Sequence, residues 1–559
     1  MLHIVSNSEE DINDVFDSIA LSEERLSKEG FQEGLNKGTK EGEIDGYHMG
    51  YHRGAELGAE LGYYNGLLKT LLSIAEEESK PLPEKVIPDI NHVLELVKSF
   101  PKTNMEDVDI IKLHMRHKLD MVVKHLEPLL LIVNSHMVNF ITNRHWDKLV
   151  PEPIKHDFKS LGPEGFFSVF WTCVESDMDT SLHKEMLEKS PNLTSFLLNA
   201  RRMSLGCSDL VLTQSQWKNM VYTVAEGPDV VTSPHVTHFM SPKKGHEVTA
   251  MSEVVGMLSA LSSSSHIVDV GSGKGYLSLV LALHHNLRVL GVDSSQVNTH
   301  GAANRTRKMQ KACKKTSQSA VNIKISDDES LSPILDTDYY KQVTAHVTEE
   351  TDLVALVDVL FPGTTCHRVA LAGLHTCGDL ASSCLRAYAR DFRLVALCNI
   401  GCCYHLMKDS LPLSQHLRSV GFLLEHNSRM LAAQAIERMA DTRQLSVEPL
   451  FYRALLQVLL EEKCGSNQPS GNVGRLAAKC SSFHEYARKA LVKLGVSIQV
   501  EEEELETLYR DHLTQRDQLA AYFGLRVSLA RAVETVILLD RLLFLHEQVP
   551  MEIHTFWFR

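Results

Sequence analysis

The sequence lacks the segments that direct a chain into or across a membrane. Its first residues, MLHIVSNSEED, contain no basic stretch followed by an apolar one. No run of about 18 uncharged apolar residues occurs later in the chain. We therefore expect neither secretion nor a membrane span.

The chain also lacks an excess of positive charge and any sign of a disulfide framework. Lys and Arg number 57 against 71 Asp and Glu, a formal net charge of −14, which disfavours binding of nucleic acid through overall charge. The 11 cysteines are odd in number and scattered, as expected of reduced thiols in the cytosol or the nucleus. The 559 residues, 43% of them hydrophobic, suffice for about three to four globular domains.

Ten glycines recur at every fourth position near the N-terminus. The residues between them mostly favour helices, so a flexible linker explains the glycine content but not its period. Each glycine costs about 1 kcal/mol relative to alanine in a helix interior, so the repeat predicts a second helix that packs closely against it. The predicted partner-binding positions are Gly30, Gly34, Gly38, Gly42, Gly46, Gly50, Gly54, Gly58, Gly62 and Gly66.

This repeat, the lead-in VFDSI at residues 15–19 and EER at 23–25 resemble the deca-Gly-x-x-x adaptor family, which includes the oral cancer-overexpressed protein and its Yae-type partner. The resemblance covers residues 10 to about 118. It implies pairing with a Yae-type helical protein and recruitment of an ABC-type ribosome-recycling ATPase to the cytosolic iron-sulfur assembly machinery. A C-terminal tryptophan contacts that machinery in the family, whereas this chain reads Trp557-Phe558-Arg559.

A second pattern joins an apolar strand, a glycine-rich turn and an amphipathic helix in the segment HIVDVGSGKGYLS, residues 266–278. Gly271, Gly273 and Gly275 let the backbone approach a ligand and leave the first N–H groups of the helix free to bind it. A second strand, predicted over 287–292, ends in Asp293, whose carboxylate is placed to accept ribose hydroxyls. The spacing is that of one βαβ nucleotide-binding unit.

The residue that follows the glycine-rich turn bears on which cofactor the unit binds. A dinucleotide-binding motif would have a small residue where this chain has Tyr276, which disfavours NAD. The pattern instead resembles motif I of class I S-adenosylmethionine methyltransferases. That resemblance implies that Asp269 helps to anchor the methionine end of the cofactor, and that Gly271 to Gly275 lie against it. The alternative is a Rossmann-like domain kept only for packing.

Two further strands, predicted over 368–374 and 392–400, end in segments rich in reactive side chains. Ligands of open parallel sheets bind outside the carboxyl ends of the strands, so we expect an acceptor atom to meet the methyl group there. In one interpretation His375 or His405 is a general base and Tyr404 stacks on or orients the acceptor.

The cysteines of these segments allow two other interpretations. Cys377, Cys402 and Cys403 with a histidine are a weaker alternative as zinc ligands, because the spacing lacks Cys-x-x-Cys pairs and adjacent cysteines ligate one metal poorly. They are otherwise small buried residues beside glycine turns. We predict no metal site, with the zinc alternative left open.

Four segments, GLHTCGDL (373–380), NIGCCYHL (399–406), CSSF (480–483) and VETVILLDRL (533–542), resemble the methyltransferase-like protein 25 family over residues 122 to about 548. The resemblance implies an S-adenosylmethionine-dependent methyltransferase of unsettled acceptor. A weaker similarity of the His-x-Cys-Gly and Cys-Cys-x-His segments to a tRNA ribose 2′-O-methyltransferase family makes RNA the first candidate. A basic run after Asp293 either follows a phosphate backbone or is a solvated helix face: Arg305, Arg307, Lys308, Lys311, Lys314 and Lys315.

We therefore predict a multidomain chain, with an all-α glycine-repeat domain followed by an α/β class I (Rossmann-like) methyltransferase with helical flanking regions. Class I sheets close with an antiparallel pair of strands, but the tail VPMEIHTFWFR supplies at most one, so the terminal strands are expected to be missing. The alternative function is a non-catalytic scaffold. The predicted parts are an adaptor-like domain over 1–120, a helical part over 121–250, the cofactor-binding core over 251–420 and a helical part over 421–559.

Overall fold

A computed structural model of the chain describes residues 86–99, 110–175, 181–208, 240–306, 339–363, 368–408, 411–443, 447–465 and 471–549, with scattered positions between 58 and 73, between 210 and 216, and at 445. The chain forms two compact units, Met1–Val108 and Asp109–Arg559. Helix α3 (Ile110–Leu126) runs through the boundary predicted at residue 120, so the second unit begins earlier than the sequence indicated.

The described part of the first unit is helical. It comprises α2 (Val86–Ser99) and helical positions between 58 and 73. The repeat glycines from Gly30 to Gly54 lie outside the described residues. A Cβ built on Gly58, Gly62 or Gly66 meets nothing within 4 Å in the described structure. The predicted packing of a second helix against the repeat stays a prediction.

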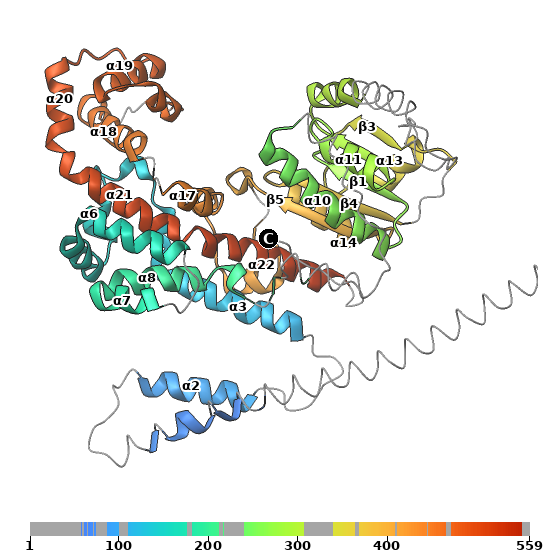
Figure 1. The fold of residues 1–559 in the computed structure, drawn as a ribbon, viewed down its shortest axis with the longest axis horizontal. Coiled ribbons are helices and arrows are strands. Elements are labelled where there is room, and N and C mark those ends of the chain that lie inside the picture. Colours follow the sequence, from blue (N-terminus) through green and yellow to red (C-terminus); the bar gives the residue numbers. More distant parts are fainter. Residues whose placement is uncertain are drawn as a thin grey trace, which may run out of the picture. The chain divides into compact units, whose positions relative to one another are not determined.

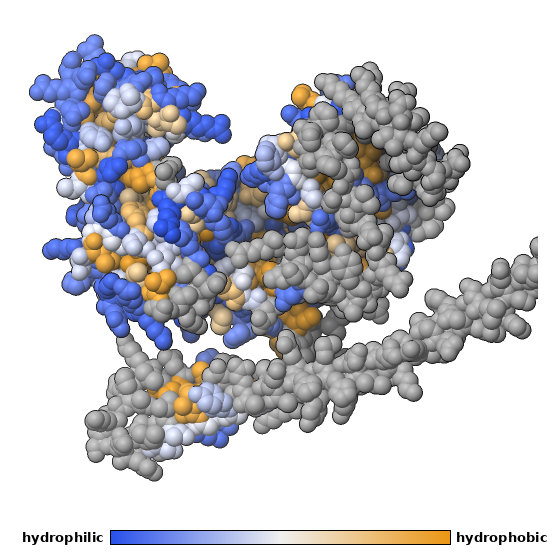
Figure 2. Space-filling model, in the orientation of Figure 1, coloured by the Kyte–Doolittle hydropathy of each residue, from blue (hydrophilic) through white to orange (hydrophobic). Residues whose placement is uncertain are grey.

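Helices that precede β1 in the sequence and helices that follow β5 build one apolar core in the second unit. The kinked helix α6 packs against α8 and α21, and Gly524 of α21 lets that helix approach Phe166 and Phe170. Figure 2 shows a mainly hydrophilic surface over α18 to α20. Besides α3, these helices are α4 (Leu130–Asn134), α5 (His145–Leu149), α6 (Glu152–Glu175), α7 (Ser181–Lys189), α8 (Pro191–Arg202), α15 (Gln415–Val420), α16 (His426–Ala432), α17 (Ile436–Thr442), α18 (Val447–Cys464), α19 (Phe483–Leu494), α20 (Glu502–Asp511), α21 (Leu513–Ser528) and α22 (Ala530–Gln548).

A five-stranded parallel sheet lies between two helical layers (Figure 1). Its order is β3-β2-β1-β4-β5, and its central strands are buried on both faces, as their nearly continuous apolar sequences dictate. The strands are β1 (His266–Val270), β2 (Arg288–Asp293), β3 (Tyr340–Thr344), β4 (Val369–Thr376) and β5 (Leu394–Gly401). The three strand ranges predicted above are confirmed to within two residues at each end.

Successive residues of the strands face opposite layers. Ile267 packs with α10 (Pro242–Leu261) and α11 (Tyr276–His284), whereas Val268 packs with α13 (Leu353–Leu360) and α14 (Leu380–Arg390). Helix α10 runs through the boundary predicted at residue 250 and packs on the sheet, so its first residues belong with the sheet.

All strand pairs of the sheet among the described residues are parallel. The tail that was expected to supply one strand, residues 550–559, lies outside the described part. No described helix combines the length and the apolar character that a membrane span requires.

Candidate functional site

The glycine-rich turn after β1 has the backbone conformation that its glycines allow. Gly271, Gly273 and Gly275 have φ of 72°, 55° and 72°, in the left-handed region where a side chain would be strained. The Gly271 N–H donates to the Val292 carbonyl at 2.8 Å, which fixes the start of the turn to β2. Helix α11 begins at Tyr276, and no side chain of its N-cap residue satisfies its first N–H groups.

Asp293, at the end of β2, ties the turn to the neighbouring strand. Its Oδ2 accepts the Gly273 N–H at 2.9 Å, and its Oδ1 accepts the Ser295 N–H at 2.8 Å and the Asn298 Nδ2–H at 3.1 Å. A carboxylate has about four acceptor positions, so one remains for a ligand. The side of the turn over Gly273 is open, because a Cβ built there meets nothing closer than the Gly271 carbonyl at 3.9 Å.

The other end of the turn is closed by β3. A Cβ at Gly275 would overlap the hydroxyl of Tyr340, which is 9% exposed. That hydroxyl donates to Gln342 Oε1 at 2.5 Å, and Gln342 Nε2 donates to the Gly273 carbonyl and to Ser272 Oγ, both at 3.2 Å. Burial raises the pKa of Tyr340, so the phenol stays a donor. The sequence contains no signal for these two supporting residues, since β3 carries neither an apolar run nor a glycine motif.

Asp269 lies behind the turn. Its side chain is 1% exposed and accepts a hydrogen bond from Ser278 Oγ of α11 at 2.5 Å. Burial raises the pKa of Asp269 to about 7, and the negative charge of Asp293 acts in the same direction. The carboxylate therefore holds α11 against β1, and its contact with the methionine end of a cofactor stays a prediction.

His375, in the last part of β4, is the most accessible of the three predicted catalytic residues. Its side chain is 46% exposed, and its Nε2 lies 3.8 Å from Glu247 Oε2 of α10. Partial burial lowers the pKa of His375. The positive charges of Lys244 and Lys243 lower this pKa further, and the negative charge of Glu247 raises it. The ring is thus mainly neutral at pH 7 and able to accept a proton.

Tyr404 and His405 follow β5, in a short 3-10 turn (Tyr404–Leu406). Tyr404 is 3% exposed, and its hydroxyl donates to Glu534 Oε1 of α22 at 3.0 Å, so its ring does not face solvent. Burial raises the pKa of Tyr404. The structure therefore gives Tyr404 a supporting position and does not favour the predicted contact with an acceptor. His405 is half-buried, and its buried Nδ1 has no hydrogen-bond partner in the described structure.

Helix α22 supports the segment after β5. Its Asp540 accepts the N–H groups of Leu413 and Ser414 at 2.7 and 2.9 Å, at the start of α15. Its Arg541 is 2% exposed and lies so close to Gly401 that a Cβ there would overlap the guanidinium. These contacts join residues more than 120 positions apart, which spacing cannot reveal. The signal available in the sequence was a charged Asp-Arg pair inside the apolar run VILLDRLLFL of residues 536–545.

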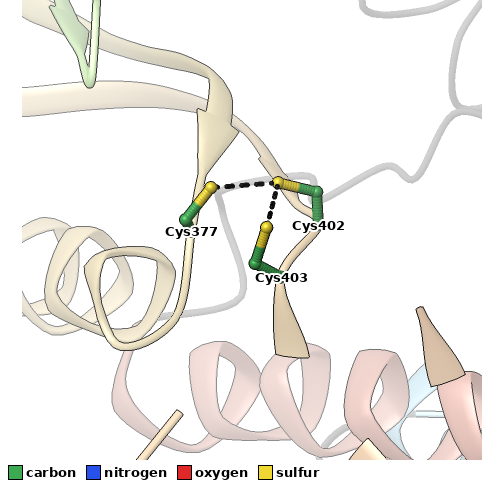
Figure 3. A group of neighbouring side chains, drawn as sticks. All are labelled: Cys377, Cys402 and Cys403. Carbon is green, nitrogen blue, oxygen red and sulfur yellow. Dashed lines mark hydrogen bonds between the residues drawn. The ribbon is translucent and has the colours of Figure 1, made fainter. Parts of the chain in front are cut away.

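Three cysteine thiols meet between the ends of β4 and β5 (Figure 3). Cys377 Sγ lies 3.3 Å from Cys402 Sγ, which lies 3.7 Å from Cys403 Sγ. Cys377 is exposed and the other two are half-buried. Burial raises the pKa values of Cys377 and Cys402. The cluster and the glycine turn occupy the same carboxyl edge of the sheet.

The basic run after Asp293 is described only at its first residue. Arg305 lies over the Tyr276 ring at 4.1 Å from its centre and donates to the Lys274 carbonyl at 3.2 Å. This arginine therefore stabilises the turn. The other five basic residues lie outside the described residues.

Comparison with known proteins supports both resemblances. A methyltransferase domain family matches residues 243–410, and a family described as essential protein Yae1, N terminal, matches residues 30–68. A mouse protein named "Probable methyltransferase-like protein 25" is 28% identical over 79% of this chain and 93% of its own length. The human protein of the same name is 27% identical over 78% of this chain and 92% of its own length.

Proposed function

From the premise that the chain is a homologue of methyltransferase-like protein 25 and carries both a methyltransferase domain and a Yae1 N-terminal domain, we propose that it is a class I S-adenosylmethionine-dependent methyltransferase. The observation that carries this proposal is the turn from Gly271 to Gly275, which is open over Gly273 and bonded to Asp293.

The sheet order supports a ligand at this place. In the order β3-β2-β1-β4-β5 the strands that follow β1 are first added on one side of it, as β2 and β3, and then on its other side, as β4 and β5. Ligands of such sheets bind at the carboxyl ends of the strands where the order changes side, here between β1 and β4. The segments that follow β1 and β4 lie close together at this switch, since a Cβ at Gly271 would lie 3.4 Å from the His375 carbonyl. A cofactor on the turn would thus lie next to the strand that carries the accessible histidine.

The residues present fit S-adenosylmethionine. The N–H groups of Tyr276 and Leu277 at the start of α11, which no N-cap side chain satisfies, and the open face of Gly273 would lie against it. The remaining acceptor position of Asp293 would take a ribose hydroxyl. When bound, the cofactor supplies a methyl group on a positively charged sulfur. The chain itself would hold the acceptor in line with the bond between the methyl group and the sulfur, and would remove the acceptor's proton. We assign the removal of the proton to His375, which has Glu247 beside it.

The acceptor that we propose to test first is RNA. Its support is the resemblance of the segments around His375 and Cys402 to a tRNA ribose 2′-O-methyltransferase family. The cytosol or the nucleus is the proposed compartment.

A second function is favoured by the Yae1 match at residues 30–68. The glycine repeat would pair with a Yae-type helical protein, and the chain would act as an adaptor toward iron-sulfur assembly components. Co-expression with a Yae-type protein, followed by size-exclusion chromatography, tests the pairing. We expect co-elution for the natural chain and its loss in a Gly58→Leu, Gly62→Leu double variant. Co-elution of the double variant would count against this role of the glycines.

Titration calorimetry of S-adenosylmethionine and its demethylated product into the full-length chain tests the first proposal. We expect micromolar binding in the natural chain and in the control variant Gly301→Leu. Gly301 lies in a helix over residues 296–306, and a Cβ built on it meets no atom within 4 Å. Binding should be lost in Gly273→Leu, with the folded state of both variants verified by circular dichroism. Absence of binding in the natural chain would refute the enzyme and favour the scaffold.

A further inference from the structure

We propose that Cys377, Cys402 and Cys403 bind one zinc ion at the carboxyl ends of β4 and β5 (Figure 3). The inference rests on the arrangement of the thiols and is independent of methyl transfer. It concerns soft thiolate sulfurs, which are ligands that zinc prefers in proteins.

The distances between the sulfur atoms fit a single metal ion. Zinc–sulfur bonds are about 2.3 Å long, so two thiolates on a tetrahedral zinc lie about 3.8 Å apart. The sulfurs of Cys402 and Cys403 are 3.7 Å apart, those of Cys377 and Cys402 are 3.3 Å apart, and all three lie within 4.8 Å of one another. Small side-chain adjustments would bring all three to one ion.

The backbone explains how adjacent cysteines serve one metal. Successive side chains of a strand point to opposite faces, which made this pair unpromising from the sequence. Strand β5 ends at Gly401, and Cys403 has φ −99° and ψ 65°, outside the extended conformation. The alternation of the strand therefore stops before the pair, and both thiols turn toward Cys377.

A buried positive charge accompanies the cluster. Three thiolates and one Zn²⁺ carry a net charge of −1, which an adjacent cation would stabilise. The Arg541 guanidinium lies against Gly401, next to Cys402 in the chain. Arg541 is 2% exposed; its Nη2 donates to Met407 Sδ at 3.6 Å, and its Nε has no hydrogen-bond partner within the described residues.

Solvent reaches the site through Cys377, which is exposed. Zinc with three protein ligands keeps a fourth position for water or another ligand. Each thiol would release its proton to solvent as its sulfur–zinc bond forms, so the oxidation states of sulfur and metal do not change. The ion would fasten the segment after β4 to the segment after β5.

The first test is the metal content of the full-length chain, purified under a phosphine reductant and measured by plasma mass spectrometry. We expect about one zinc per chain, and a loss of at least about tenfold in Cys377→Ser and in Cys403→Ser. The matched control is Cys398→Ala in β5, the strand that precedes Cys402 and Cys403; its thiol contacts Met251 Sδ at 3.5 Å. Equal zinc content in the Cys377 variant and the control would overturn the proposal.

A second measurement uses the natural chain and needs no variant. After removal of metal by a chelator, zinc should slow alkylation of Cys377 by iodoacetamide, as followed by mass spectrometry. Cys207 is an exposed thiol outside the cluster and should react equally with and without zinc. Cobalt should give a near-ultraviolet thiolate-to-metal band. If zinc does not slow alkylation of Cys377 and cobalt gives no such band, the proposed site does not exist. If the purified chain contains copper in place of zinc, the choice of metal is wrong.

Discussion

Replacement of Gly275 by alanine should destabilise the sheet far more than the same replacement at Gly273. Both glycines have left-handed backbone conformations, with φ of 72° and 55°. They differ in what an added Cβ would meet. At Gly273 nothing lies closer than 3.9 Å, whereas at Gly275 the Cβ would overlap the Tyr340 hydroxyl and lie 3.1 Å from Ala302 Cβ.

The magnitudes follow from these contacts. The left-handed conformation costs alanine about 1–2 kcal/mol at either position. At Gly275, displacement of Tyr340 adds about 1–3 kcal/mol for overpacking. Loss of its 2.5 Å bond to Gln342 adds about 1–3 kcal/mol for a buried unpaired phenol. Because these terms overlap, we expect a loss of about 4 kcal/mol for Gly275→Ala and about 1 kcal/mol for Gly273→Ala.

The assay is hydrogen-exchange mass spectrometry of peptides covering β1 and α11, in increasing urea, which gives the free energy of their opening. Gly301→Ala, in open space, is the control for handling of the variants. If the two glycine variants differ by less than about 1 kcal/mol, the described packing of Tyr340 on the turn is wrong.

Three further outcomes are expected. Because burial raises the pKa of Asp269 to about 7, its favourable contribution to stability is present below about pH 4 and is lost as the pH rises to 7. The stability gain of Asp269→Asn, followed by urea denaturation, should therefore grow between pH 5 and pH 8, by about 3 kcal/mol; an equal gain at both pH values would contradict the assigned burial. His375→Ala should lower the rate of methyl transfer about 10²–10⁴-fold without changing cofactor affinity. In the natural chain this rate should persist below pH 6.5, because the pKa of His375 is lowered. An unchanged rate of radiolabel transfer in the His375 variant would show that His375 takes no part in the reaction. Tyr404→Phe should cost about 1 kcal/mol of stability through its bond to Glu534 and leave cofactor binding unaltered, whereas weakened binding would place Tyr404 in the site.

The parts of the fold that the sequence predicted are those with a local signal. Strands β1, β2, β4 and β5 are apolar runs that end in glycine or polar residues, and the turn needs glycine at three spaced positions. Strand β3 (Tyr340–Thr344) escaped prediction because only Tyr340 in it is buried. An edge strand with one inward-facing aromatic residue has no periodicity to detect.

The position of the candidate residues at one edge of the sheet was predictable, but their individual contacts were not. The strand ends bring His375 and the three cysteines to one edge, which follows from parallel topology alone. The burial of Tyr404 depends on Glu534 in α22, and the convergence of Cys402 and Cys403 depends on one pair of backbone angles. Both are three-dimensional facts that spacing does not encode.

Helix α22 is shared by two cores. Residues from Val533 to Leu543 lie in the helical core, and Leu545 lies in the core under α13 and α14. The helix has 19 residues, so it is about 28 Å long and continuous through both. Unfolding of one core alone would require either that α22 breaks or that Asp540 and Arg541 become exposed to solvent. Both of these charged side chains are buried. We therefore expect the sheet and the helices in the described part of residues 109–559 to unfold together and not one after the other.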